Sequence, residues 1–269
     1  MLRILPDSFD QVGEVSYRDL LRTGMVNRKS IPILTARVHG LPASLAGLVA
    51  LADLQGRGGT AAHPRLPTFD VLDALSAMAD DGVIPALDSM IAITAGDLFA
   101  HLQLHKRGGT GDVRGCWLAM RDRFRAVAGV AGNHDAFGIS PADKASFERE
   151  DGIHLLQGRS VTINGVAFAG ECGVIGDPTR RAFRHAEEQF CETIDRLVQG
   201  RPDVLLLHQG PVVSTDPARS NEAIRARCAK LRQGVVICGH NHTEQTFEEM
   251  PSGAQVLSVH ERVVVLTPA

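Results

Sequence analysis

The chain has 269 residues, of which 44% are hydrophobic, and its formal net charge is −3. This length and apolar content suffice for a large core, while the small, evenly spread charge gives no indication of a nucleic-acid groove. No Pro/Ser-rich linker or block of like charge divides the sequence. We therefore expect a single domain over residues 1–269, with residues 1–45 packed on it as an N-terminal strand or hairpin extension.

The termini and the cysteines bear on location. The first residues, MLRILPDSFDQ, contain no continuous apolar run, and no later stretch is long and apolar enough to suggest a membrane span. We expect a cytoplasmic protein with no membrane partner. The cysteines are odd in number, widely spaced and without CxxC pairs, which predicts reduced, buried thiols.

The first half of the sequence alternates predicted strands and helices. VALADLQGRGG, residues 49–59, is typical of a buried strand that ends in polar residues and glycines. A helix is predicted from a Thr68 cap to Gly82, because its apolar residues recur on one helical face. The strand SMIAITAGDL follows, then the loop KRGGTGDVRG, the amphipathic helix CWLAMRDRFRA and the strand VAGVAGNHD.

The second half predicts a sheet-rich end. SVTINGVAFAGECGVI contains an Asn164-Gly165 pair between two alternating runs, which is a strong hairpin signal. A long helix is predicted over residues 178–200, followed by the strands DVLLLHQGP and GVVICGHNH and by short C-terminal strands. The pattern favours a mixed α/β fold of two packed sheets with helices outside.

Polar side chains stand where these buried strands end. They are Asp53 with Gln55, Asp97, Asn133 with His134, His208, and His240 with His242. Each follows an apolar run beside a glycine, at the edge of the sheet where α/β folds bind ligands. A single Gly-Asp is usually a turn, and a single strand-end histidine is usually a core residue. Together, however, these residues predict a metal site.

The order of these motifs resembles that of one protein family. The blocks ADLQG, AGDLF, AGNHD, LLHQG and CGHNH are similar to the D-x-H, GD-x-x-[DN], GNH-[DE], strand-end His and GH-x-H motifs of the calcineurin-like metallophosphoesterases. The last third of the chain also resembles a bacterial branch of that family. The resemblance implies a metallophosphoesterase-like sandwich of two mixed β-sheets flanked by helices, with metal ions at its rim.

The resemblance also implies a ligand set and a reaction. One ion would be held by Asp53, the Gln55 position, Asp97 and His242, and a second ion by Asp97, Asn133, His208 and His240. These two divalent ions, of Mn, Fe, Zn or Ni, would hold a phosphate mono- or diester and a metal-bridging hydroxide that attacks it. His134 would serve the leaving group, and Asp135 would orient His134 or lie at the surface.

Three positions depart from the family pattern. Gln55 replaces an imidazole by an amide, whose oxygen is usually a weaker donor to transition metals. Ala100 stands where a polar residue is expected, so an orienting contact is missing. ARVHG, residues 36–40, imitates a D-x-H-G block with Arg37 in place of Asp, and it is better explained as a strand packed beside LVALAD.

The remaining basic residues are weaker candidates. Arg57 is favoured for touching a substrate phosphate, because its fork of donors suits that anion, whereas His63 in the same loop is expected to be exposed. Arg180, Arg181 and Arg184 would ring the pocket or lie on a solvated helix face. We assign no site to His101, His105, His154, His185 and His260, and we expect His260 to be exposed in a hairpin turn.

Two classes of function follow. The preferred class is a metal-dependent phosphatase or phosphodiesterase, because most of the ligand positions and His134 are present. The alternative is a metal-binding regulatory or interaction protein of the same fold, with weak or no hydrolysis because of the change at Gln55.

Overall fold

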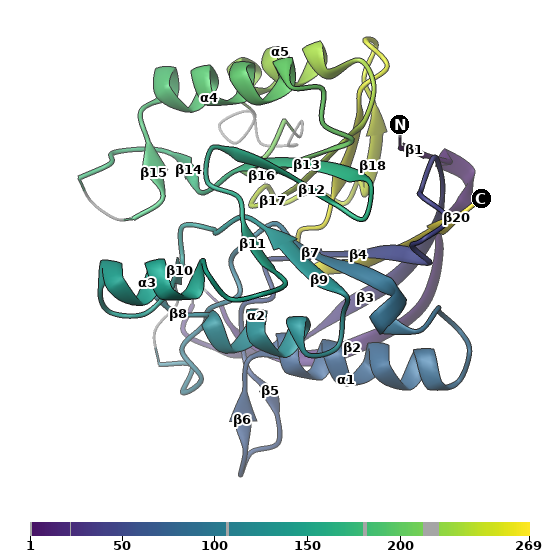
Figure 1. The fold of residues 1–269 in the computed structure, drawn as a ribbon. Coiled ribbons are helices and arrows are strands. Elements are labelled where there is room, and N and C mark those ends of the chain that lie inside the picture. Colours follow the sequence, from purple (N-terminus) through teal and green to yellow (C-terminus); the bar gives the residue numbers. More distant parts are fainter. Residues whose placement is uncertain (1, 22, 106–107, 180–181, 212–220) are drawn as a thin grey trace.

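The computed structural model describes residues 2–21, 23–105, 108–179, 182–211 and 221–269. Two mixed β-sheets pack on one another, and helices cover their outer faces (Figure 1). The sheets account for the apolar runs of the sequence, because the strands β4, β7, β16 and β17 are buried along their whole length or nearly so.

The larger sheet has eight strands in the order β1-β3-β20-β4-β7-β9-β11, with β2 paired to β3. β4, β7, β9 and β11 run parallel, whereas β20 is antiparallel to β4 and parallel to β3. The strands are β1 (Arg3–Ile4), β2 (Asp10–Leu20), β3 (Val26–His39), β4 (Gly47–Ala52), β7 (Met90–Thr94), β9 (Ala126–Gly129), β11 (Ile153–Leu155) and β20 (Arg262–Pro268).

The smaller sheet has six strands in the order β12-β13-β16-β17-β19-β18. Its four central strands are parallel, and its two edge strands are antiparallel to their neighbours. The strands are β12 (Arg159–Ile163), β13 (Val166–Glu171), β16 (Val204–Gln209), β17 (Val235–Gly239), β18 (Phe247–Glu249) and β19 (Gln255–Ser258).

The helices lie on the outside of the sandwich. α1 and α2 cover the larger sheet, and α4 and α5 cover the smaller one (Figure 1). The α-helices of the described residues are α1 (Pro67–Asp80), α2 (Arg114–Arg121), α3 (Pro141–Phe147), α4 (Glu187–Gln199) and α5 (Glu222–Cys228), with short 3-10 turns η1 (Pro6–Ser8), η2 (Leu87–Ser89) and η4 (Ala229–Leu231). Short strands form three pairs: β5 (Gly58–Gly59) with β6 (Pro64–Arg65), β8 (Gly111–Asp112) with β10 (Asp135–Ala136), and β14 (Val174–Ile175) with β15 (Arg184–His185).

Alternate residues of the smaller sheet face different layers. In β16, Leu206 packs with the core of the larger sheet, while Leu205 and Leu207 pack with α4 and α5 residues such as Phe190 and Ile224. This is the two-residue period of a strand that is covered on both faces. Both faces of β16 are covered, and its polar residues, His208 and Gln209, stand at its end.

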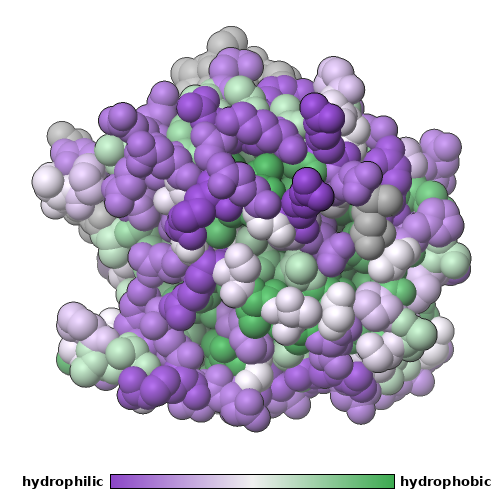
Figure 2. All heavy atoms as spheres, turned by 45° about the horizontal axis from the view of Figure 1, so that its top comes forward, coloured by the Kyte–Doolittle hydropathy of each residue, from purple (hydrophilic) through white to green (hydrophobic). Residues whose placement is uncertain are grey.

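α4 shows why the outer helices form. Its buried side chains recur at helical spacing, and its remaining positions are mostly charged or amide residues; the buried ones are Phe190, Cys191, Ile194, Leu197 and Val198. Figure 2 shows hydrophilic residues over most of the face that α4 and α5 turn outward. A helix of this pattern is stabilised mainly by burying one face against the sheet.

Several details of the sequence prediction are confirmed. Asn164 and Gly165 join β12 to β13 with φ angles of 48° and 83°, as the favoured two-residue hairpin turn requires. All five cysteines are free and buried. Among the described helices, none is long and apolar enough to cross a membrane.

Other details were wrong. The helix expected over residues 178–200 begins only at Glu187, because Arg184 and His185 pair with β14 and Ala186 is extended. The expected cap Thr68 is buried inside the first turn of α1, whose N-cap is Leu66. The strand with Arg37 does not lie beside β4, because β20 is inserted between them. α2 begins and ends earlier than predicted.

Candidate metal centre

Strand ends from both sheets meet at one cavity. Asp53 follows β4 and Asp97 follows β7 in the larger sheet, while His208 lies near the end of β16 and His240 follows β17 in the smaller one. Asp53, Asp97 and His240 line a cavity of about 410 Å³. That volume lies within the usual range for small-molecule sites, which is roughly 300–1,000 Å³.

Three of these residues adopt an uncommon backbone conformation. The φ angles of Asp53, Asp97 and His240 are 57°, 56° and 62°. Positive φ is rare outside glycine and costs free energy, and such residues gather at functional sites because the surrounding structure holds them there. The sharp turn that each makes at its strand end brings its side chain to the rim of the sandwich.

Small residues are required around the two carboxylates. A Cβ at Gly132 would lie 2.0 Å from Asp97 Oδ1, and one at Gly239 would lie 2.3 Å from Asp53 Oδ2. Any side chain at these positions would displace a carboxylate. The glycines of AGNHD and CGHNH therefore have a packing reason in this site.

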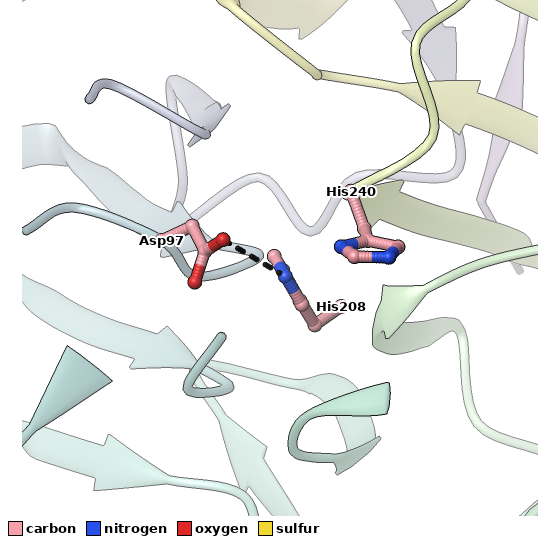
Figure 3. A group of neighbouring side chains, drawn as sticks. All are labelled: Asp97, His208 and His240. Atoms are coloured by element: carbon pink, nitrogen blue, oxygen red, sulfur yellow. Dashed lines mark ion pairs between the residues drawn. The ribbon is translucent and has the colours of Figure 1, made fainter. Parts of the chain in front are cut away.

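Asp97, His208 and His240 form a group that could hold a metal ion. One donor atom from each lies within 4.8 Å of the others, and Figure 3 shows the His208 ring between the Asp97 carboxylate and the His240 ring. His208 Nε2 lies 3.4 Å from Asp97 Oδ2, and its Nδ1 lies 2.7 Å from the carbonyl oxygen of Ala95. Because that carbonyl can only accept, Nδ1 carries a proton, so the lone pair of a neutral ring is on Nε2, as in metal-binding histidines.

Two buried polar atoms of the predicted ligand residues have no hydrogen-bond partner. They are Nε2 of His208 and Oδ1 of Asn133, and both residues are buried. Buried donors and acceptors are nearly always satisfied in folded proteins, so an unpartnered pair calls for an explanation. A cation bound by nitrogen and oxygen lone pairs would satisfy both, and this set of donors therefore fits a divalent metal ion.

The charges at the site are strongly coupled. Burial by itself would lower the pKa of His208, but the Asp97 carboxylate raises it to about 9. Burial, reinforced by His208, lowers the pKa of His240 to about 4. Burial opposes ionisation of Asp53, but His260 holds the pKa of this carboxyl below its ordinary value. The centre thus has two carboxylates whose charges depend on nearby positive groups.

His134 is held at the cavity wall by two contacts. Its backbone N–H donates to Asp97 Oδ1 at 2.8 Å, and its Nδ1 lies 2.5 Å from the carbonyl oxygen of Gly109. Nδ1 is therefore the protonated nitrogen, which leaves Nε2 as the other functional atom of the half-buried ring.

Asp135 has neither of the environments expected for it. It is buried rather than exposed, and its carboxylate accepts backbone N–H groups of Asp97, Leu98 and Gly132 at 2.8–2.9 Å instead of orienting the His134 ring. Burial and the charge of Asp97 raise its pKa to about 6. Asp135 fixes the two loops that carry Asp97 and Asn133.

Gln55 and Arg57 differ in their position relative to the cavity. Gln55 lines it, and its Nε2 donates to the carbonyl oxygen of Phe99 at 3.3 Å. Arg57, expected to touch substrate, is not among the described lining residues, and its backbone pairs with Arg18 in β2. Ala100 also lines the cavity.

The sequence prediction of an exposed His260 was wrong. Its exposed fraction is 7%, it lines the cavity, and its Nδ1 lies 3.2 Å from Asp53 Oδ2. Its Nε2 is 2.8 Å from Nδ1 of His242, which also lines the cavity. The available signal was the apolar run QVLSV before His260, the same strand-end pattern as in LLLH. His101, likewise assigned to no site, lines the cavity too.

The other basic candidates lie elsewhere. His63 is exposed in the loop between β5 and β6, as expected, and lines a separate hollow. Arg184 belongs to β15, and Arg180 and Arg181 lie outside the described residues.

Comparison with known proteins shows the fold. No protein-family model matches the chain, and no curated protein matches it. The solved structure of TT1561 from Thermus thermophilus is similar to it over 80% of this chain and 88% of TT1561, with a TM-score of 0.52 and 15% identity. The sulfate thiohydrolase SoxB from Thermus thermophilus is similar over 82% of this chain and 53% of the SoxB chain, with a TM-score of 0.43 and 12% identity. The predicted fold class, a metallophosphoesterase-like α/β sandwich of two mixed sheets flanked by helices, is confirmed.

Proposed function

We propose that this chain is a metal-dependent phosphoesterase that hydrolyses a phosphate mono- or diester with two divalent ions. The observation that carries the proposal is the meeting of Asp97, His208 and His240 within 4.8 Å. Asn133, whose Oδ1 is buried and unpartnered, precedes His134, whose backbone N–H donates to Asp97. These residues come from four separate strand ends, in the motif order of the family that the sequence resembles.

The donors suggest how the ions are shared. We define the His208 site as the one formed by Asp97, Asn133, His208 and His240, whose donors are described above. We define the Asp53 site as the one formed by Asp53 and Asp97, with Gln55 and His242 as further candidates from the sequence. Mixed nitrogen and oxygen donors suit Mn, Fe, Zn or Ni.

The charge of the cavity supports a requirement for cations. Four carboxylates are among the described residues that line it, and no lysine or arginine is; the carboxylates are Asp19, Asp53, Asp97 and Glu261. A phosphate ester would be repelled by such a wall unless positive ions were bound. When bound, two divalent ions neutralise these carboxylates, hold phosphoryl oxygens and lower the pKa of water.

The chain supplies the remaining functions. His134 would donate a proton from Nε2 of its doubly protonated ring to the leaving oxygen, while the Gly109 carbonyl oxygen accepts from Nδ1 and holds the ring in place. Asp135 would maintain the positions of Asp97 and Asn133 through the backbone groups it binds. The leaving group would occupy the side of the cavity near His101 and Phe99, which line it.

A binding or regulatory function is the second candidate. It is favoured by Gln55, whose amide stands in place of an imidazole and whose nitrogen is bound to the Phe99 carbonyl. In this case one ion would be bound without efficient hydrolysis.

Metal-dependent hydrolysis tests the proposal. Protein stripped with EDTA and reloaded with Mn²⁺ or Co²⁺ should hydrolyse p-nitrophenyl phosphate or its bis-ester only after reloading. Asp97→Asn and Asp97→Ala should abolish this activity, whereas Asp73→Asn, an exposed carboxyl on α1, should leave it unchanged. Equal activity of stripped and reloaded protein contradicts the proposal. Metal uptake without hydrolysis of either ester supports the regulatory alternative.

A further inference from the structure

We infer that His260 supplies, through Nδ1, the imidazole ligand that the Asp53 site lacks at Gln55. The inference deepens the proposed function, because it rests on a divalent ion being bound beside Asp53. It concerns a residue that the motif pattern does not contain, and the contacts of His260 carry it.

The backbone brings His260 to the site in the same way as the other donors. β19 is parallel to β17, and His260 follows β19 as His240 follows β17. His260 also forms a parallel bridge with Ala52, the residue before Asp53. It is thus a fifth strand-end side chain at the same rim, and it adjoins the larger sheet where Asp53 leaves it.

The distance from the His260 ring to the Asp53 carboxylate is similar to that from the His208 ring to the Asp97 carboxylate. His260 Nδ1 lies 3.2 Å from Asp53 Oδ2, and His208 Nε2 lies 3.4 Å from Asp97 Oδ2. In both pairs the imidazole nitrogen is buried and has no hydrogen-bond partner. A nitrogen and an oxygen about 3 Å apart are at the separation expected of two neighbouring ligands, each roughly 2.0–2.2 Å from one ion.

The other nitrogen of His260 has the outer partner that a metal-binding histidine requires. Nε2 lies 2.8 Å from Nδ1 of His242. If Nδ1 of His260 gives its lone pair to an ion, Nε2 carries the proton and donates it to His242. His242 then accepts through Nδ1, so it positions His260 instead of binding the ion. The His242 side chain is exposed, whereas the exposed fraction of His260 is only 7%. This difference agrees with His260 as the ligand and His242 as its outer partner.

A purely positioning role for His260 is the competing explanation. In that role Nδ1–H would donate to Asp53 Oδ2. The 3.2 Å contact is within the distance of an ion pair, but it does not have the geometry of a hydrogen bond, whereas the backbone N–H of His240 does donate to the same oxygen at 2.8 Å. A direct bond from His260 to the ion explains both the short distance and the unpartnered nitrogen.

Metal counting and a thiolate probe distinguish these roles. The parent protein and three variants would be stripped of metal, titrated with Co²⁺ and analysed for bound metal by calorimetry and elemental analysis. The variants are His260→Ala, Gln55→Ala and His242→Ala. In parallel, His260→Cys and, as a matched control, His242→Cys would be examined for the sulfur-to-cobalt charge-transfer band, with the parent protein as the background for its own five cysteines. Circular dichroism of the stripped proteins checks that each variant folds.

We expect the parent to bind two Co²⁺ ions and His260→Ala to bind the second at least tenfold more weakly. Gln55→Ala should retain more of that affinity than His260→Ala, and the charge-transfer band should appear in His260→Cys but not in His242→Cys. A band in His242→Cys alone, or His260→Cys that binds two ions without a band, overturns the inference. A parent that binds no ion overturns the inference and the proposed function together, whereas two bound ions with no ester hydrolysis contradict only the function. If His260→Ala does not fold, the Cys variants decide.

Discussion

The backbone N–H of His134 donates to Oδ1 of Asp97 at a distance of 2.8 Å. The loop that carries the proposed proton donor is thus bound to the carboxylate that both ions would share. Because this bond comes from the backbone, it survives any substitution of the His134 ring. The ring and the metal ions can therefore be tested separately.

His134→Ala should keep both metal ions and lose turnover. Loss of a positioned acid typically lowers the rate about 10²- to 10⁴-fold, while the hydrogen bond to Asp97 remains. Single-turnover hydrolysis of an aryl phosphate and elemental analysis of the same sample measure the two effects. Loss of an ion from this variant would instead identify His134 as a ligand. An ester with a much better leaving group should recover part of the rate.

Gln55→His should strengthen binding of the ion at the Asp53 site, because an imidazole is a better donor than an amide for transition metals. The metal concentration that gives half-maximal activity should fall, while Gln55→Ala should raise it modestly. Turnover need not rise, since a stronger donor makes metal-bound water less acidic. Metal titrations of the three proteins with an aryl phosphodiester measure this. Identical titrations and metal contents would mean that Gln55 does not touch the ion.

Gly132→Ala should disrupt the centre. The added Cβ would lie 2.0 Å from Asp97 Oδ1 and 2.5 Å from the Asp97 backbone nitrogen, so the loop must move. Overpacking of this kind costs about 1–3 kcal/mol of folding free energy. We expect a lower melting temperature and weaker binding of both ions. Gly115→Ala, in α2, where the nearest atom is 4.0 Å away, is the matched control; it should bind both ions like the parent and be no less stable. Equal metal affinity in the two variants would contradict this packing argument.

Glu171→Gln should alter the pH dependence of stability. Burial raises the pKa of Glu171 from 4.5 to about 7, and His185, 3.7 Å away, offers little compensating charge because burial lowers its own pKa. Between about pH 4.5 and 7 the folded state binds more protons than the unfolded state, so the free energy of unfolding falls as pH rises through this window.

The neutral amide of Glu171→Gln does not ionise, so it removes this fall in the free energy of unfolding. From pH 5 to pH 8, Glu171→Gln should gain up to about 2–3 kcal/mol in unfolding free energy relative to the parent. Urea denaturation of both stripped proteins at the two pH values measures the gain. Glu150→Gln, at an exposed position, controls for the loss of one charge. A constant difference between parent and Glu171→Gln at all pH values would show that Glu171 ionises normally in the folded state.

The sequence predicts the sandwich and most strand ends because the pattern that identifies them lies within each segment of the chain. Apolar runs such as those before Asp53 and His208 are long enough to identify buried strands, and a polar residue directly after such a run must lie at the sheet edge. The start of α4 could not be predicted in this way. Residues 184–185 have a sequence compatible with a helix, but a distant strand, β14, uses their backbone.

The environments of His260 and Asp135 depend on contacts between distant segments. His260 follows the apolar run QVLSV but precedes Glu261 and Arg262, and the structure buries it where it forms a bridge with the distant Ala52. Asp135 is bound to backbone N–H groups of another loop, which no side-chain pattern encodes. Sequence motifs therefore predicted the residues of the candidate centre, whereas its outer contacts required the structure.

The insertion of β20 between β3 and β4 determines when the larger sheet can form during synthesis of the chain. β3 and β4 are made early, yet they cannot join the same sheet until residues 262–268 have emerged to pair with both. Until then β4 presents an unpaired apolar edge, a state that is prone to aggregation. Asp53 stands at the end of that edge, and its neighbour His260 arrives just before β20. Deletion of residues 262–268 should therefore yield chains that depend on chaperones and cannot complete the centre, even though every motif residue has been synthesised.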